Sequence, residues 1–233
     1  MGFDVLPGPS LPELARTALA SAAAATVSHA SPAAGPAAVR QVPVRNGPAG
    51  SPVLLAGTGS ALARQLTAPP QAVTVTVPAR VPFSALRLTG PAEPTAHDHT
   101  ARITAYTVTV RSAEFTGASR VQVPLDQYRA AAPDPLWREA VGVLRHLEQG
   151  HMAELIRCIR AHGMPQADWV IPRGLDRYGL EFLVLTPGSV AAVRLSFPDG
   201  PIISLQDVPA SIRTALTCRC RSAPGHDHGP ASI

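Results

Sequence analysis

The chain has 233 residues, and its 45% of apolar residues are enough to build a sizeable core in one large domain or two small ones. No apolar run approaches the ~20 residues that cross a bilayer as a helix, which excludes a membrane-spanning helix. The formal net charge is +4 and every basic residue other than histidine is arginine. This composition indicates a globular protein without pointing to a function.

Targeting and redox signals favour a cytoplasmic protein. The stretch LARTALASAAAATVS resembles the apolar part of a signal peptide, but Asp4 and Glu13 precede it and no basic cluster opens the chain. The three cysteines are an odd number, with Cys158 isolated, which favours a reducing compartment over a disulfide framework. We therefore expect a cytoplasmic location. We also expect residues 1–9 to form a flexible N-terminus.

The first half of the chain opens with a short helix and then changes to a strand pattern. Ser10 and Glu13 have the spacing of a capping box, and Leu11, Leu14 and Leu19 share one helical face. Short segments rich in Val and Thr follow, separated by Gly, Pro and Asn, which is typical of strands. These segments are AATVSH, VRQVPVR, SPVLLAG, QAVTVTVP, FSALRLTG and RITAYTVTVRSAEFTG.

Details of these segments indicate an antiparallel barrel. Val alternates with Thr from Val73 to Val77, which predicts a strand with one buried face. Asn46-Gly47 is a hairpin signal, and Pro43 places its strand at an edge or a bulge. One small helix, GSALARQL, interrupts the strands. The pattern predicts a barrel domain that ends near residue 132.

The second half alternates helical and strand patterns. Asp134 can cap a helix that starts at Pro135, and helical spacing continues to Gly163 with a candidate break at Gly150. Strand patterns return in GLDRYGLEFLVL and AAVRLSF, and a last helix is expected to end at Thr217. These elements predict a compact α+β domain after the barrel.

Six arginines and no acidic residue lie between Glu13 and Glu93, and this field of positive charge is a candidate anion-binding site. Such a field attracts an anionic ligand, and guanidinium groups pair with phosphate or carboxylate through two hydrogen bonds. A phosphate, a haem propionate or a nucleic-acid backbone would satisfy it, and the alternative is a set of solvated surface arginines. The arginines between Glu13 and Glu93 are Arg16, Arg40, Arg45, Arg64, Arg80 and Arg87.

One stretch within this field has a specific arrangement. In GTGSALARQL the helix N-terminus at Ser60 offers free backbone donors, and Arg64 lies one turn further along. Together these groups can hold a phosphate. An ordinary serine cap is the alternative.

Histidine and cysteine clusters are candidate metal or haem sites. The sequence HDH occurs at residues 97–99 and again in the tail, where cysteines precede it. Cys220, His226 and His228 are therefore candidate metal ligands, because thiolate and imidazole are the groups that zinc prefers. We expect a disordered tail that binds metal at most weakly, and the alternative is haem capture by His226 or His228.

Two further histidines lie in the long helical pattern. His146 and His151 are about 140° apart around an unbroken helix, so they would not hold one metal from one face. His151 shares an apolar stripe with Leu147 and Leu155, and we expect it to be buried and hydrogen-bonded in the seam between the helix and the C-terminal strands. A ligand role for His151 is the alternative. The sequence has no nucleophile elbow, phosphate-binding glycine loop or His-Glu-x-x-His motif, and catalytic residues stay unassigned.

The second half resembles a known family. The stretches RHLEQGHMAELIRCIRAHG, GLDRYGLEFLVL, VRLSFPDGP and IRTALTC are together similar to the small C-terminal α+β domain of haem-utilisation proteins. In that domain a His-x4-His helix is followed by an Asp-x-x-Gly strand entry and a strand that ends in Phe-Pro. The matching positions in this chain are His146, His151, Asp176, Gly179, Phe197 and Pro198.

The resemblance implies an architecture and a class of ligand. In the family this domain follows a split β-barrel of the pyridoxamine-phosphate-oxidase, FMN-binding type. The expected fold is thus an antiparallel split β-barrel over residues 10–132, a small helix-plus-strands domain over 133–221 and a flexible tail over 222–233. Members bind haem or flavin, some degrade haem, and a plastid relative regulates the first enzyme of tetrapyrrole synthesis.

A homodimer that binds a small anionic cofactor, haem or FMN, is therefore the leading expectation. The expected cofactor-binding residues are Arg40, Arg45, Ser60, Arg64 and His151. We expect haem utilisation or an oxidoreductase role, and the alternative is a non-catalytic regulatory protein whose barrel has lost its cofactor. A protein partner is compatible with both, whereas a membrane or nucleic acid is not expected.

Overall fold

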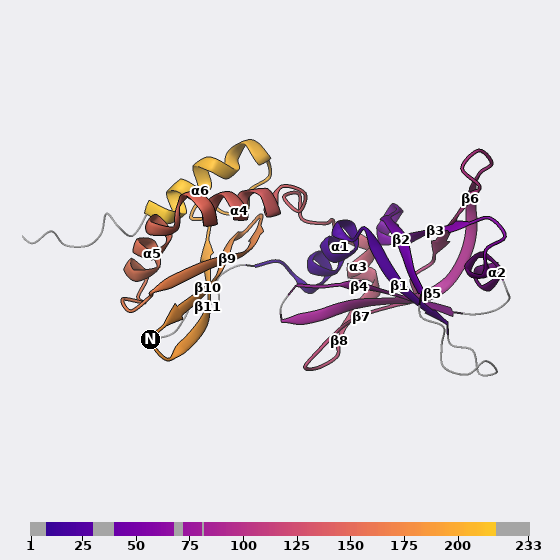
Figure 1. The fold of residues 1–233 in the computed structure, drawn as a ribbon, viewed down its shortest axis with the longest axis horizontal. Helices are drawn as coiled ribbons and strands as arrows, with labels where there is room; N and C mark the ends of the chain where they lie inside the picture. The colour runs from indigo at the N-terminus through magenta and orange to yellow at the C-terminus, as the bar shows by residue number, and fades with distance from the viewer. Residues whose placement is uncertain (1–7, 30–39, 68–71, 81, 218–233) are drawn as a thin grey trace, which may run out of the picture. The chain divides into compact units, whose positions relative to one another are not determined.

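The structure is a computed structural model that describes residues 8–29, 40–67, 72–80 and 82–217 (Figure 1). The chain divides into two compact units. One runs from Ser10 to Asp134, and the other comprises the described residues from Pro135 onward together with Gly8 and Pro9. Within the described residues, no helix is long and apolar enough to span a membrane.

A closed six-stranded antiparallel barrel forms the first unit. Its strands follow the order β4-β1-β2-β3-β6-β5, and pairing of β4 with β5 closes the circle. Two short strands, β7 and β8, continue the sheet beyond β5. The six barrel strands are β1 (Ala24–His29), β2 (Arg40–Asn46), β3 (Pro52–Gly57), β4 (Ala72–Pro78), β5 (Phe83–Asp98) and β6 (Ile103–Val108).

The remaining elements of this unit are short. They are α1 (Leu11–Ser21), the 3-10 helix η1 (Pro48–Gly50), α2 (Ala61–Thr67), β7 (Ser112–Gly117), β8 (Val121–Val123) and α3 (Leu125–Ala130). The predicted capping box of α1 is present, since the Ser10 N–H donates to Glu13 Oε2 at 2.8 Å and Ser10 Oγ accepts from the Glu13 N–H at 3.4 Å.

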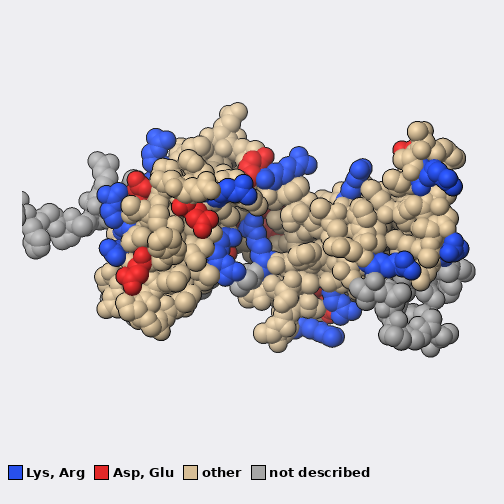
Figure 2. Space-filling view, in the orientation of Figure 1, with Lys and Arg blue, Asp and Glu red and all other residues tan. Residues whose placement is uncertain are grey.

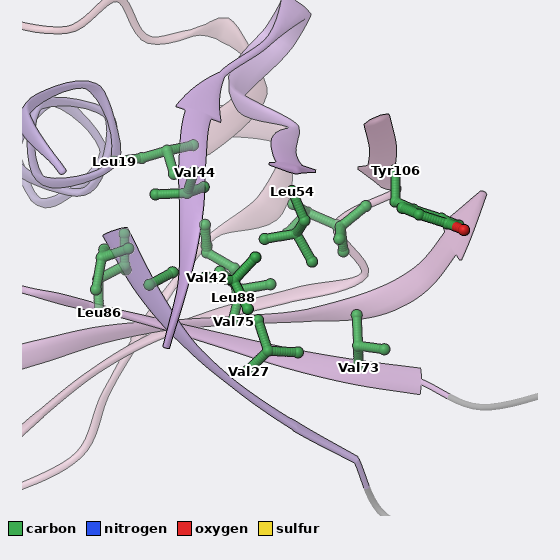
Figure 3. Packing of buried hydrophobic residues seen from close by; sticks show 14 of the residues in the cluster. Leu19, Val27, Val42, Val44, Leu54, Val73, Val75, Leu86, Leu88 and Tyr106 are labelled. Carbon is green, nitrogen blue, oxygen red and sulfur yellow. The ribbon is translucent and has the colours of Figure 1, made fainter. Parts of the chain in front are cut away.

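Alternating apolar residues fill the barrel, as the sequence predicts. Val73, Val75 and Val77 of β4 are at most 1% exposed, because alternate side chains of a strand point to the same face. Figure 3 shows Val73 and Val75 among side chains of β1, β2, β3 and β5, and Leu19 of α1 belongs to the same core cluster. The expected antiparallel barrel is therefore confirmed.

The long strand β5 pairs with two different barrel strands along its length. It pairs with β4 from Ala85 to Pro91 and with β6 from Ala92 onward. The change of partner occurs beside Gly90, where a Cβ atom would lie 1.9 Å from the Thr109 carbonyl oxygen. Only glycine permits this close approach of two backbones.

The predicted hairpin after β2 exists with a longer connection than a two-residue turn. Asn46 pairs with Pro52, and η1 lies between them. The residues with positive φ are Ala49 and Gly50, not Asn46 and Gly47. Pro43 lies where β2 pairs with β1 only, so its missing N–H interrupts no ladder with β3.

A buried tyrosine of α3 is hydrogen-bonded to the connection between β2 and β3. The Tyr128 hydroxyl of α3 donates to the Gly50 carbonyl oxygen at 2.6 Å, and the buried guanidinium of Arg16 lies 5.6 Å from the centre of the Tyr128 ring. Burial raises the pKa of Tyr128 well above its usual range, against an opposing effect of Arg16. The hydroxyl therefore stays protonated and acts as a donor.

The second unit is a three-stranded antiparallel sheet with helices on one face (Figure 1). The strands follow the order β11-β10-β9, and both α4 and α5 contact β9. This α+β arrangement was expected from the sequence. Its elements are α4 (Ala140–Gly150), α5 (Met152–Ala161), β9 (Trp169–Asp176), β10 (Gly179–Thr186), β11 (Ser189–Ser196), η2 (Leu205–Asp207) and α6 (Val208–Thr217).

We predict that the Tyr128 hydroxyl contributes to the stability of the barrel unit. Tyr128→Phe leaves the buried Gly50 carbonyl without its donor, so the free energy of unfolding should fall by about 1–3 kcal/mol. Urea denaturation followed by circular dichroism measures the change. Tyr106→Phe is the matched control, because Tyr106 is also buried and its hydroxyl makes no hydrogen bond within the described residues. Equal losses in the two variants would contradict the assignment.

Candidate functional site

A pocket of about 780 Å³ lies in the second unit, lined by residues of α4, α5 and α6. Apolar side chains supply much of its wall, notably Val143, Leu147, Val208, Ile212 and Leu216. The volume is within the range of roughly 300–1,000 Å³ that is usual for small-molecule and cofactor sites. The pocket is therefore large enough for a cofactor with a broad apolar surface.

The spacing of residues on the helices explains this wall. Val143 and Leu147 are four residues apart on α4, and Val208, Ile212 and Leu216 repeat at the same interval on α6. Residues four apart share one face of a helix. Each helix therefore presents an apolar row to the pocket, and Leu147, Val208 and Ile212 are also part of the core cluster of this unit.

Two histidines meet in the wall of the pocket. His146 Nε2 and His151 Nε2 are 3.2 Å apart, and the ring centroids are separated by 5.0 Å with an interplanar angle of 68°. The sequence analysis separated them on an unbroken helix and named Gly150 as a candidate break. The helix ends at Gly150, and His151 has φ −132° and ψ 21° between α4 and α5, which changes the direction of the chain.

The predicted environment of His151 is wrong. Its side chain is 42% exposed and lines the pocket, whereas burial in the seam with the C-terminal strands was expected. The reason is the helix break, since it removes His151 from the row formed by Leu147 and Leu155, which are both buried. The ligand role that the sequence left as an alternative for His151 stays a prediction.

Three charged residues complete the wall. Glu154 of α5 faces the histidine pair, with its Oε2 atom 3.4 Å from His151 Nδ1. Arg157 of α5 and Arg213 of α6 also line the pocket. A guanidinium group binds a carboxylate or phosphate through two parallel hydrogen bonds, so this wall suits an anionic group at the edge of an apolar ligand.

Sequence reasoning did not find Glu154, Arg157 or Arg213. Arg157 follows Glu154 by three residues on α5, but Arg213 comes from a helix more than fifty positions further along the chain. The tertiary packing of α6 against α5 is what brings these charges to one pocket. A partial signal existed, because both arginines border apolar rows with helical spacing.

The barrel arginines do not form one site. Arg16 is buried and donates to the carbonyl oxygens of Tyr128 and Arg129 at 3.4 Å, which makes it a structural residue. Arg87 forms an ion pair with Glu114 at 3.0 Å. On the face shown in Figure 2, basic side chains are scattered rather than gathered in one patch.

The four barrel residues predicted to hold an anion lie on two separate elements. Arg40 and Arg45 are exposed on β2, and Ser60 and Arg64 belong to α2 and its N-terminal side. Arg45 pairs with Val53 near the start of β3, whereas α2 follows the end of that strand. Arg45 and Arg64 therefore lie toward opposite ends of β3.

Ser60 and Arg64 already make hydrogen bonds within the protein. Ser60 Oγ accepts from the Ala63 N–H at 3.1 Å, and the Arg64 guanidinium donates to the Gly59 carbonyl oxygen at 2.6 Å. Both contacts stabilise the loop that enters α2. A cofactor role for Arg40, Arg45, Ser60 and Arg64 stays a prediction.

The first HDH sequence shapes a hairpin. Asp98 Oδ1 accepts from the N–H groups of Thr100 and Ala101 at 2.9 Å, and His97 Nδ1 lies 2.9 Å from Thr104 Oγ1. The tail candidates Cys220, His226 and His228 lie outside the described residues. Within the residues that are described, no group of three or more His, Cys, Asp or Glu is arranged to hold a metal ion.

The chain is similar in structure to a heme binding protein from Mycobacterium smegmatis. The two share 23% sequence identity and a TM-score of 0.66 over 93% of this chain and 100% of that protein. A protein of unknown function from Agrobacterium tumefaciens aligns over 92% of this chain and all of its own length, with 16% identity and a TM-score of 0.40. No family model matches the chain, and no curated protein matches it in sequence.

The first of these similarities defines the fold class. It covers both units, so the expected architecture of a split barrel followed by a small α+β domain is confirmed. At this level of identity the likeness establishes the fold alone.

We predict a structural role for the Ser60 hydroxyl. Ser60→Ala removes the acceptor for the Ala63 N–H at the start of α2, and loss of such a cap costs about 1 kcal/mol of stability. Urea denaturation measures the loss. Ser51→Ala is the control. It should leave the stability nearly unchanged, because Ser51 contacts η1 through its backbone N–H and not through its side chain. A Ser60→Ala variant as stable as the control would show that the cap contributes little.

Proposed function

We propose that this protein binds haem in the pocket between α4, α5 and α6. The observation that carries the proposal is the combination, in one apolar pocket, of an adjacent histidine pair with two arginines. Imidazole is the commonest protein ligand of haem iron, and arginine suits the two propionate carboxylates. The structural similarity to a heme binding protein supports the same class of ligand.

The residues present fit the chemical requirements of haem. The apolar rows of α4 and α6 would contact the macrocycle, and His146 and His151 would supply the nitrogen ligand. Arg157 and Arg213 would pair with the propionates. Bound haem would supply an iron centre that carries electrons or small ligands, whereas the protein's contribution is to bind, orient and partly exclude water.

FMN in the barrel is a less favoured assignment. The candidate phosphate-binding residues are not gathered at one place, because Arg45 and Arg64 lie toward opposite ends of β3. The proposal assigns binding and no reaction, so it is compatible with haem utilisation, an oxidoreductase role or a regulatory role. The homodimer, the cytoplasmic location and a protein partner stay predictions.

We predict that haemin binds with about one equivalent per chain and gives a saturable Soret band. Arg157→Ala and Arg213→Ala should each weaken binding about tenfold or more, since charge-assisted hydrogen bonds contribute roughly 1.5–3 kcal/mol. A haemin titration followed by absorbance measures the affinity. The His146→Ala, His151→Ala double variant should lose the absorbance of histidine-ligated haem.

Barrel variants provide the matched controls for this titration. Arg45→Ala and Arg64→Ala remove the same charge from the other unit and should leave the affinity unchanged. The opposite pattern, with binding lost in the barrel variants and kept in the pocket variants, would move the site to the barrel. A parallel titration with FMN, followed by quenching of its fluorescence, tests the flavin assignment.

A further inference from the structure

The two pocket histidines cannot both ligate one haem iron in the arrangement seen. Porphyrin nitrogens occupy the equatorial positions, so protein ligands bind only on the axis, from opposite faces. With metal–nitrogen distances of about 2.0 Å, two axial nitrogens would be roughly 4 Å apart with their rings pointing away from each other. Here the Nε2 atoms are 3.2 Å apart and the rings are T-shaped, with centroids at 5.0 Å. One of the two is therefore the ligand.

The neighbouring carboxylate distinguishes the two rings. Glu154 Oε2 lies 3.4 Å from His151 Nδ1, and a carboxylate only accepts hydrogen bonds. A carboxylate this close to Nδ1 favours the tautomer of His151 that carries its hydrogen on Nδ1, and this tautomer leaves a lone pair on Nε2. His146 Nε2 is then the donor in the 3.2 Å contact between the rings. At the point where the rings meet, His151 offers the lone pair that a metal needs.

We propose that His151, and not His146, is the haem ligand that this pocket supplies, and that Glu154 is its positioning residue. This inference rests on the proposed function, haem binding in this pocket. Metal-binding histidines commonly donate their second N–H to a carboxylate, which fixes the ring and makes its other nitrogen more basic.

The local sequence produces this arrangement. His151 precedes α5 and Glu154 lies in its first turn, three residues further on, so the two side chains share one face. The carboxylate also lies at the N-terminal end of α5, where a negative charge is favourable. Because the break at Gly150 takes His151 out of α4, His151 lines the pocket, and Glu154 lines it one turn further along.

The first test is Glu154→Gln in the full-length protein loaded with haemin. The amide keeps the size of the side chain and removes the charge, so we expect about a tenfold or greater loss of haem affinity. The midpoint potential of the iron should shift to more positive values, because the imidazole becomes a weaker donor. Glu139→Gln removes the same charge outside the pocket and is the control. Identical affinity and potential in the two variants would overturn the positioning role.

The second test separates the two histidines. The ferric wild-type protein should give the spectrum of histidine-ligated haem. His146→Ala should keep this spectrum, whereas His151→Ala should lose the ligation by this pocket and regain it with imidazole in solution. Loss of histidine ligation in His146→Ala, or an unchanged spectrum in His151→Ala, would overturn this inference and leave haem binding intact. Absence of any haem binding by the wild-type protein would overturn the proposed function itself.

Discussion

The change of chain direction at Gly150 and His151 is the constraint on which the pocket depends. The backbone bends without losing its local hydrogen bonds, since the His151 N–H donates to the Leu147 carbonyl and the His151 carbonyl accepts from Leu155. Leu147 and Leu155 stay buried on either side of the bend. The same bend that keeps both helices on the sheet therefore turns His151 toward His146. A straight helix would keep the apolar row and separate the two rings.

The two units use arginine in different ways. In the barrel, two arginines of the acid-free stretch contact residues outside that stretch. Arg87 pairs with Glu114, and Arg16 donates to the carbonyl oxygens of Tyr128 and Arg129. Two of the six arginines of this stretch, Arg16 and Arg87, are thus engaged in contacts within the barrel unit. In the C-terminal unit, Arg157 and Arg213 come from separate helices and line one cavity. The packing of helices therefore brings together the positive charges that suit an anionic ligand. The local density of arginine in the sequence does not reveal where they meet.

The proposed haem site lies in the C-terminal unit, although four of the five expected cofactor-binding residues belong to the barrel unit. The barrel interior is filled by Val, Leu and Ala side chains, as Figure 3 shows, so it is a packed core. The small unit has a pocket because three helices cover one face of three strands and their apolar rows do not close against each other. The chemistry of this pocket supplies the residues on which the proposed haem binding rests.

The sequence by itself determined the two units, the strand alternation, the capping box of α1 and the helical rows of the second half. These features depend on contacts a few residues apart, where side-chain spacing and backbone preference decide the outcome. Only the tertiary structure decided that Arg16 and Arg87 are structural, that the break at Gly150 brings His151 to His146, and that α6 brings Arg213 to the same pocket. Such outcomes depend on which distant segments pack together. A burial pattern is local, whereas a binding site needs groups from several elements to meet at one place.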